Sequence, residues 1–236
     1  MMWNRKELKV RGKSALHRNY GTAVFVTILM GIISFFSSGN VSVNYSGESM
    51  HMWETMPHEM RIFSGILAAS LISFGMIGML LKILVENVLI VGGSLFFVKN
   101  QTERPGVDMI LSGFRSGHYG NIVKVMFLKD IKLLLWSLLL IVPGIIKGYE
   151  YKMIPYILAE NPAMDRESAF KISKSMMQGQ KMEAFILDLS FFGWLILGSL
   201  LCGLPLVFYV RPYMEATYSE MYTFNKMKAY QEGTIR

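Results

Sequence analysis

The order of apolar and basic residues along this chain predicts that it crosses a membrane repeatedly. Long apolar runs contain almost no Lys or Arg, and the basic residues gather in every second gap between the runs. This alternation is typical of polytopic membrane proteins, whose cytoplasmic loops hold an excess of Lys and Arg. The pattern therefore predicts an all-α fold, a polytopic transmembrane helical bundle with the N- and C-termini in the cytoplasm.

The lengths of the apolar runs predict about six spans, because a helix of roughly 20 residues crosses the hydrocarbon core. Together they form a transmembrane domain over residues 21–223, between a basic cytoplasmic N-terminal helix, 1–20, and a cytoplasmic tail, 224–236. The predicted spans are residues 21–38, 62–82, 122–142, 145–160, 184–201 and 206–222.

Two segments leave alternatives open. Residues 83–98 are apolar but contain Glu86 and a Gly92-Gly93 pair, so they extend the second span as a bent helix or lie against the inner surface. The Pro143-Gly144 pair predicts the outer turn between the third and fourth spans. If this pair instead lies at mid-membrane, residues 143–160 belong to a re-entrant hairpin whose ends both remain inside.

Amphipathic helices are expected on the inner membrane surface. One is the basic N-terminal helix. The other is predicted to begin with Asn161 as its N-cap and Pro162 in its first turn, and Gly179 is placed to end it. Between these signals, apolar residues from Ala169 to Met177 recur at helical spacing.

Composition and charge narrow the class of protein further. The chain has 236 residues, of which 52% are hydrophobic and only 17% charged, whereas about a quarter are charged in typical soluble domains. Its net charge of +7 lies beside apolar runs without a nucleic-acid-binding motif, so we expect anionic lipid headgroups as partners and no nucleic acid. The single Cys202 rules out an intrachain disulfide.

Three stretches carry a resemblance to a known family. They are Leu135-Trp136-Ser137-Leu138-Leu139-Leu140-Ile141-Val142-Pro143-Gly144-Ile145-Ile146-Lys147, then Pro155-Tyr156-Ile157-Leu158-Ala159-Glu160-Asn161-Pro162, then Phe185-Ile186-Leu187-Asp188-Leu189-Ser190-Phe191-Phe192-Gly193-Trp194 with Pro212-Tyr213 and Thr217. The chain thereby resembles the domain of unknown function 975 family of bacterial integral membrane proteins. The resemblance implies a location in the cell membrane, and it brings no catalytic or ligand-binding residues with it.

Charged residues inside the predicted spans are the candidate site residues. Arg211 lies in the sixth span with Glu215 one turn further on the same helical face. The structural interpretation is that Arg211 pairs with Glu215, or donates to a backbone carbonyl group that Pro212 leaves without its helical hydrogen bond. The functional interpretation makes Arg211 an anchor for an anionic headgroup or substrate, with Lys147 at a similar depth.

Three further charges lie in the fourth and fifth spans. Lys147 and Glu150 are three residues apart on one helix, and Glu150 could also meet Arg211 or Lys132. Asp188 is the best single acidic candidate, for coupling or for pairing with a lysine such as Lys132. A structural charge network explains all three, and a proton or ion relay is the functional alternative.

The sequence contains no recognisable catalytic motif, so we expect a non-enzymatic protein without a cofactor or a metal site. We attribute the Met- and His-rich stretch 50–60 to chance. The leading hypothesis is a membrane protein that handles a lipid-like or small amphipathic solute or contributes to envelope defence. The alternative is an accessory or scaffold subunit that docks a membrane or cytoplasmic partner, or a second copy of itself, through the helices at 1–20 and 165–178.

Overall fold

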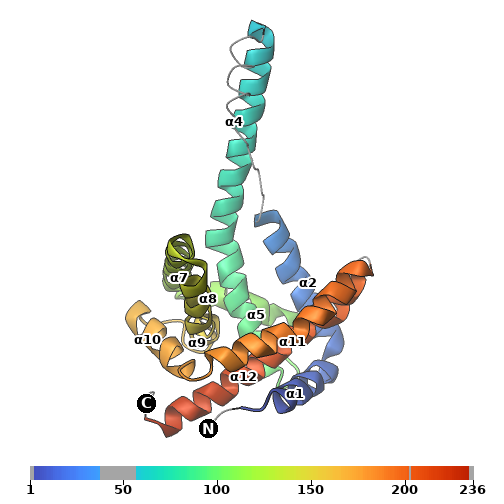
Figure 1. The fold of residues 1–236 in the computed structure, drawn as a ribbon, viewed down its shortest axis with the longest axis vertical. Helices are drawn as coiled ribbons and strands as arrows, with labels where there is room; N and C mark the ends of the chain where they lie inside the picture. The colour runs from blue at the N-terminus through green and yellow to red at the C-terminus, as the bar shows by residue number, and fades with distance from the viewer. Residues whose placement is uncertain (1–2, 38–56, 202, 234–236) are drawn as a thin grey trace.

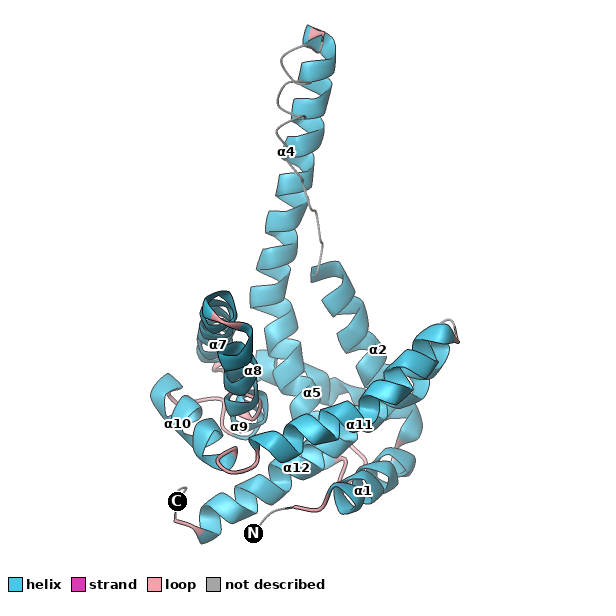
Figure 2. Ribbon diagram, in the orientation of Figure 1, coloured by secondary structure: helices cyan, strands magenta, loops and turns pink. Residues whose placement is uncertain are grey.

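The computed structural model describes residues 3–37, 57–201 and 203–233, and every regular element in these ranges is a helix (Figure 2). The all-α prediction is therefore confirmed. In chain order the elements are α1 (Arg5–Arg18), α2 (Tyr20–Ser37), α4 (His58–Leu81), η1 (Lys82–Glu86), α5 (Asn87–Lys99), η2 (Val107–Leu111), α6 (Ser112–Arg115), α7 (Tyr119–Leu139), α8 (Ile141–Glu150), α9 (Ile154–Glu160), α10 (Arg166–Met176), α11 (Lys181–Leu200), η3 (Leu206–Val210) and α12 (Arg211–Gln231).

The core lies at one end of the molecule, in a region that we call the base. The base comprises α1, α5, α9, α10, α12 and the N-terminal halves of α7 and α11. Both chain termini lie at this end (Figure 1). The central helix is α5, which is buried around most of its circumference. Its Phe96 and Phe97 and the Tyr222 side chain of α12 are among the largest side chains that are fully buried.

Close helix crossings in the base depend on glycine. A Cβ atom at Gly92 would collide with the carbonyl oxygen of Ile110 in η2, and one at Gly93 would lie 2.5 Å from the sulfur of Met30. This glycine pair therefore permits close packing of the surrounding segments. Gly12 of α1 similarly lets the backbone of Thr217 in α12 approach closely.

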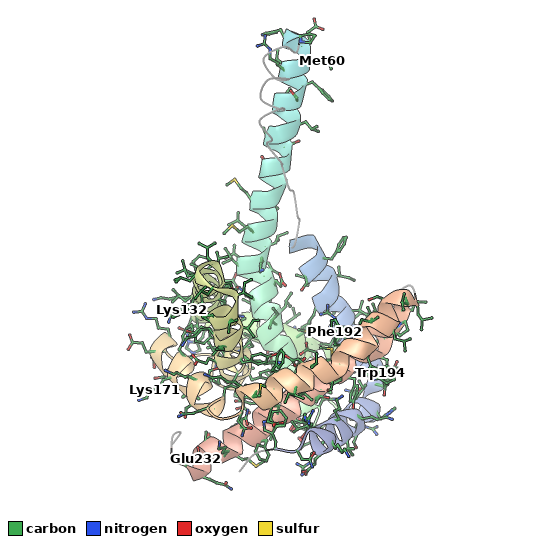
Figure 3. All side chains as sticks on the ribbon, in the orientation of Figure 1. Met60, Lys132, Lys171, Phe192, Trp194 and Glu232 are labelled. Atoms are coloured by element: carbon green, nitrogen blue, oxygen red, sulfur yellow. The ribbon has the colours of Figure 1, made fainter. Side chains whose placement is uncertain are left out.

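A single long helical rod runs from His58 to Lys99 through α4, η1 and α5. The π-helical turn η1 (Lys82–Glu86) joins the two α-helices without breaking the rod. Residues 83–98 therefore extend the second predicted span, which was one of the two alternatives. Figure 3 shows Met60 at the far end of this rod, away from the base.

Four apolar segments project from the base toward the same end of the molecule: α2, α4, the α7–α8 hairpin and the α11–η3 segment (Figure 1). Their outer parts have exposed side chains. For example, Phe35 is 79% exposed, Phe63 71%, Leu138 82% and Leu200 77%. We refer to these outer parts as the apolar tips. The tips have the opposite character to the base, where apolar side chains are buried.

The prediction of six spans is not confirmed. In the part of the chain that the structure describes, two helical segments are long and apolar enough to cross a membrane, Gly75–Lys99 and Lys181–Leu200. A third candidate arises if α1 and α2 form one span bent by 100°. Residues 145–160 divide between the short helices α8 and α9, so they are too short to span as a helix.

The predicted third and sixth spans also differ from the structure. Residues 122–142 fall on α7 and the start of α8, and 206–222 fall on η3 and α12, which are not among the candidate spans. The reason in both cases is charge: α7 contains Asp130 and Lys132, and α12 contains Arg211 and Glu215. Packing within the protein covers α12 and the N-terminal part of α7 instead.

Two predicted boundaries are wrong. The break between α7 and α8 lies at Leu140, whose backbone is extended, and Pro143 lies in the first turn of α8, where it breaks no helical hydrogen bond. The N-cap of α10 is Asp165 rather than Asn161, which ends α9. The backbone N–H of Ser168 donates to the Asp165 carboxylate and lowers the pKa of that group. Gly179, with φ of 73°, ends the turn after α10 as predicted.

The basic N-terminal helix is confirmed as α1, but it lies on protein rather than offering its apolar face to a membrane. Leu8, Ala15 and Leu16 are buried against the rest of the base. The apolar face of α10 is likewise buried through Ala169 and Phe170.

Candidate functional site

Two carboxylates that the sequence singled out are centres of polar clusters where α8 and α9 meet α10 to α12. The first is Glu150, whose side chain is only 6% exposed. One of its oxygens accepts a hydrogen bond from Lys147 at 2.6 Å, and the other accepts from Lys181. We call these three residues the Glu150 cluster. The predicted Lys147–Glu150 pair is thus confirmed, but the second partner is Lys181, not Lys132 or Arg211.

Opposing effects act on the pKa of Glu150. Burial raises the pKa of its carboxyl group, while hydrogen bonds and charge from Lys147 and Lys181 lower it and prevail, so that the pKa lies below its ordinary value. The folded protein therefore holds Glu150 as a carboxylate. Its main-chain oxygen is also bound, because the hydroxyl of Ser173 in α10 donates to it at 2.6 Å.

The second cluster is centred on Asp188 of α11. Its carboxylate accepts hydrogen bonds from the hydroxyl of Tyr149 at 2.9 Å, the ammonium of Lys152 at 2.9 and 3.0 Å, and the hydroxyl of Tyr218 at 2.8 Å. The Lys152 ammonium also lies 3.9 Å from the centre of the Tyr218 ring. Asp188 therefore pairs with a lysine, which was one of the alternatives for this residue, but the lysine is Lys152 instead of Lys132. We call these four residues the Asp188 cluster.

Both clusters satisfy their own charges, which favours the structural interpretation. Each carboxylate is matched by at least one ammonium group, and the remaining lone pairs accept further donors. Charges that are paired this completely within the protein hold helices together. A proton or ion relay would instead need a group that takes up and releases the proton or ion. The clusters tie α8 and the turn after it to α11 and α12, which fixes the position of the hairpin relative to the base.

Arg211 and Glu215 are not brought together as an ion pair within the described residues. Arg211 is exposed at the start of α12, and Glu215 is partly buried within electrostatic range of both Arg211 and Lys152. Lys147, which was expected near Arg211, is engaged by Glu150 instead. The predicted anchor for an anionic group therefore lacks a second converging cation among the described residues.

An open cavity of about 650 Å³ lies beside these clusters, between α5, α9, α10 and α12. Its volume is within the range of about 300–1,000 Å³ that is common for small-molecule sites. The wall is divided almost evenly between apolar and polar groups, and the polar groups gather on α9, α12 and the end of α5. The lining residues are Leu95, Val98, Lys99, Ile157, Ala159, Glu160, Asn161, Met164, Ile172, Met176, Tyr222, Lys226 and Tyr230.

Glu160 organises the polar side of the cavity. Its carboxylate accepts 2.6 Å hydrogen bonds from the hydroxyl of Tyr222 and the ammonium of Lys226, and the Tyr222 ring stacks on that of Tyr156. Lys99, at the end of α5, is exposed and forms no ion pair with another described residue. Two lysines thus face one carboxylate, which leaves the cavity an excess of positive charge.

Sequence reasoning missed this cavity, although one signal for it was present. Glu160 belongs to the Pro155–Pro162 stretch that carried the family resemblance, yet it has no charged neighbour at helical spacing. Its partner Lys226 lies 66 residues away. Pairing over such a separation follows from the packing of α9 on α12 and cannot be inferred from periodicity along one helix.

Over the residues that the structure describes, this geometry defines an all-helical protein with two helices, or three if the bent pair is one span, that could cross a membrane. The profile of the family described as "Protein of unknown function (DUF975)" matches residues 138–227. The predicted resemblance is therefore confirmed, and the matched region contains both clusters and most of the cavity wall. No curated protein and no solved structure matches the chain.

Proposed function

We propose that this chain is a multi-pass protein of the cell membrane that binds a small amphipathic molecule in the cavity between α5, α9, α10 and α12. The cavity carries the proposal: it is the right size for a small molecule, and its wall combines apolar side chains with convergent polar groups. Its excess of lysine favours a ligand with an apolar tail and an anionic head. Such a ligand fits either the handling of a lipid-like solute or a part in envelope defence.

The shape of the molecule supports insertion in a membrane with the base in the cytoplasm. The apolar tips point away from both termini (Figure 1), and apolar side chains this exposed need a non-aqueous surrounding. In this arrangement the apolar outer parts of α2, α4 and α11 enter the lipid, and α5, the termini and the cavity lie with the base on the basic, cytoplasmic side.

The scaffold alternative receives less support. Its proposed docking faces are the apolar sides of α1 and α10, and both sides are already covered: Leu16 of α1 is fully buried and Phe170 of α10 is 9% exposed. A partner would have to displace part of the core to reach them.

Ligand binding can be tested on the full chain in lipid nanodiscs. The probe is dansyl-undecanoate, and the signal from empty nanodiscs is subtracted. We expect saturable binding that weakens by about tenfold in Ile172→Trp, because the larger ring fills the cavity. The matched control Ile196→Trp places the same ring on the exposed side of α11 and should bind like the wild type. Equal binding by Ile172→Trp and wild type would exclude the cavity.

A second variant tests the charge of the ligand. Lys99→Gln should weaken binding of the dansyl-undecanoate anion several-fold, by roughly 1 kcal/mol for one lost exposed charge contact, and leave binding of a dansyl-alkylamine of equal length unchanged or stronger. Loss of both probes to the same extent would show that Lys99 acts through the fold and not through the head group.

A further inference from the structure

The α7–α8 hairpin (Tyr119–Glu150) ends in an apolar tip whose surface no other described part of the protein covers. The exposed side chains occupy both legs and the turn at Leu140. They are Leu134, Leu135, Trp136, Leu138, Leu139, Leu140, Ile141, Val142, Ile145 and Ile146, each at least 38% exposed. The two legs of the tip pack closely, because Gly144 has no side chain. A Cβ atom at Gly144 would stand only 2.9 Å from the Cα atom of Ser137.

Charged residues mark where this apolar surface ends on both legs. On α7 the last charge before the turn is Lys132, whose ammonium lies 3.8 Å from the centre of the Phe170 ring. On α8 the first charge after the turn is Lys147, which lies 5.3 Å from the centre of the Trp136 ring. The two lysines thus mark the lower edge of the tip, one on each leg, at similar distances from Leu140.

The height of the tip fits half of a bilayer. From Lys132 to Leu140 the helix rises about 12 Å, and the return leg to Lys147 rises about 10 Å. One half of the hydrocarbon core is about 15 Å thick. A hairpin that crossed the whole core would instead bury Lys129, Asp130 and Lys132 in lipid, which is costly.

Contacts below the tip keep those charges in the protein. Asp130 accepts a hydrogen bond from the buried amide of Asn87 at 2.9 Å and pairs with Lys129 at 3.3 Å. Together with the Glu150 cluster, the region has four lysines against two carboxylates. This excess suits the anionic headgroups of the leaflet that the tip enters. The charged residues are Lys129, Asp130, Lys132, Lys147, Glu150 and Lys181.

We propose that the α7–α8 hairpin is a wedge that inserts into one leaflet only, the leaflet next to the base, with Leu140 near the bilayer midplane. This proposal rests on the membrane insertion proposed above but not on ligand binding in the cavity. The occupant of the apolar surface is lipid, because the surface is exposed on both legs and at the turn, ends at a lysine on each leg and is close in height to the thickness of one leaflet.

The test uses single cysteines in a Cys202→Ser background of the full chain. Leu140→Cys and Ile141→Cys sit at the turn, where both side chains are exposed and substitution leaves the core intact. Lys171→Cys on α10 (labelled in Figure 3) is the base-side control, and Ser46→Cys, in the loop predicted to be external, is the outer control. An impermeant maleimide is applied to intact cells and to inside-out vesicles.

We expect Lys171→Cys to label only in inside-out vesicles, Ser46→Cys only in intact cells, and the two turn positions from neither side. A bimane attached at position 140 in proteoliposomes should be quenched most by lipids with nitroxides deep in their acyl chains. Labelling of the turn from intact cells would overturn the proposal in favour of a full crossing. Labelling in inside-out vesicles, or the absence of quenching by any lipid nitroxide, would show that the tip is in water or under protein.

Discussion

The base and the apolar tips follow opposite rules of residue placement within one chain. In the base, apolar side chains are buried and charged groups pair across helices, as in the Glu150 and Asp188 clusters. In the tips, leucines and phenylalanines face outward and the helices diverge from one another (Figure 1). The comparison teaches that tertiary contacts stabilise the base, whereas the tips depend on their surroundings. Substitutions should therefore have very different effects in the two regions.

The largest effect is expected from Glu150→Ala. This change leaves Lys147 and Lys181 without their shared carboxylate in a mostly buried place, which should lower the free energy of unfolding by about 3 kcal/mol. The measurement is unfolding of purified protein by SDS in mixed micelles. The control is Glu167→Ala, whose side chain is 85% exposed on α10. If both variants lose the same stability, the cluster does not hold the base together.

Glycine substitutions are expected to have the second-largest effect on stability. Gly92→Ala in the base should lower the free energy of unfolding by about 1–3 kcal/mol, because its Cβ would collide with the Ile110 backbone. Gly193→Ala on α11 meets nothing within 4 Å and should be neutral or slightly stabilising. Equal effects in the same assay would mean that close packing does not distinguish the two regions.

Acid should weaken the base through Glu150. Because the pKa of this group is lower in the folded protein than in the unfolded chain, the stability that it contributes is complete above its ordinary pKa and is lost as the pH falls toward the lowered value. The thermal midpoint should therefore fall less steeply in Glu150→Gln than in wild type as the pH is lowered from about 6 to about 3, a range that brackets the ordinary pKa of a carboxyl group. Parallel curves would contradict the assignment.

The smallest effect is expected at the tip. Leu138→Ser changes a side chain that is 82% exposed, so the free energy of unfolding in detergent should change by less than about 0.5 kcal/mol. Val125→Ser, which changes a fully buried side chain of the same helix, is the matched comparison and should be clearly destabilising. A large effect of Leu138→Ser would show that the tip contributes to the core.

Sequence patterns predicted the helices better than they predicted what surrounds them. The all-α class, the basic helix and the Lys147–Glu150 pair follow from local spacing, and the structure bears them out. Local spacing left open whether residues 83–98 continue the second span. The errors arose where apolar content was taken as evidence of a span. Apolar residues such as Ile157 and Leu158 are buried in the base, and a hydrophobic run does not distinguish a protein core from lipid.

The candidate site was harder to predict because its partners are distant in sequence. Asp188 meets Lys152 and Tyr149 across 36 and 39 residues, respectively. A single sequence indicates which charges need partners but not which helices will meet. The choice of Lys181 over Lys132 as the partner of Glu150 depends on the turn after α10, where Gly179 redirects the chain into α11.

The π-helical turn at Lys82–Glu86 has a consequence for how this gene can change. A π-helical turn accommodates one residue more than an α-helical turn, so it absorbs that residue without rotating α4 relative to α5. Deleting Val85 would convert it to an ordinary turn and leave the sides that α4 presents to its neighbours nearly unchanged, whereas deleting one residue elsewhere in α4 or α5 would rotate the two parts of the rod by about 100° relative to each other. Loss of one residue should therefore be tolerated far better at this turn than along the rest of the rod.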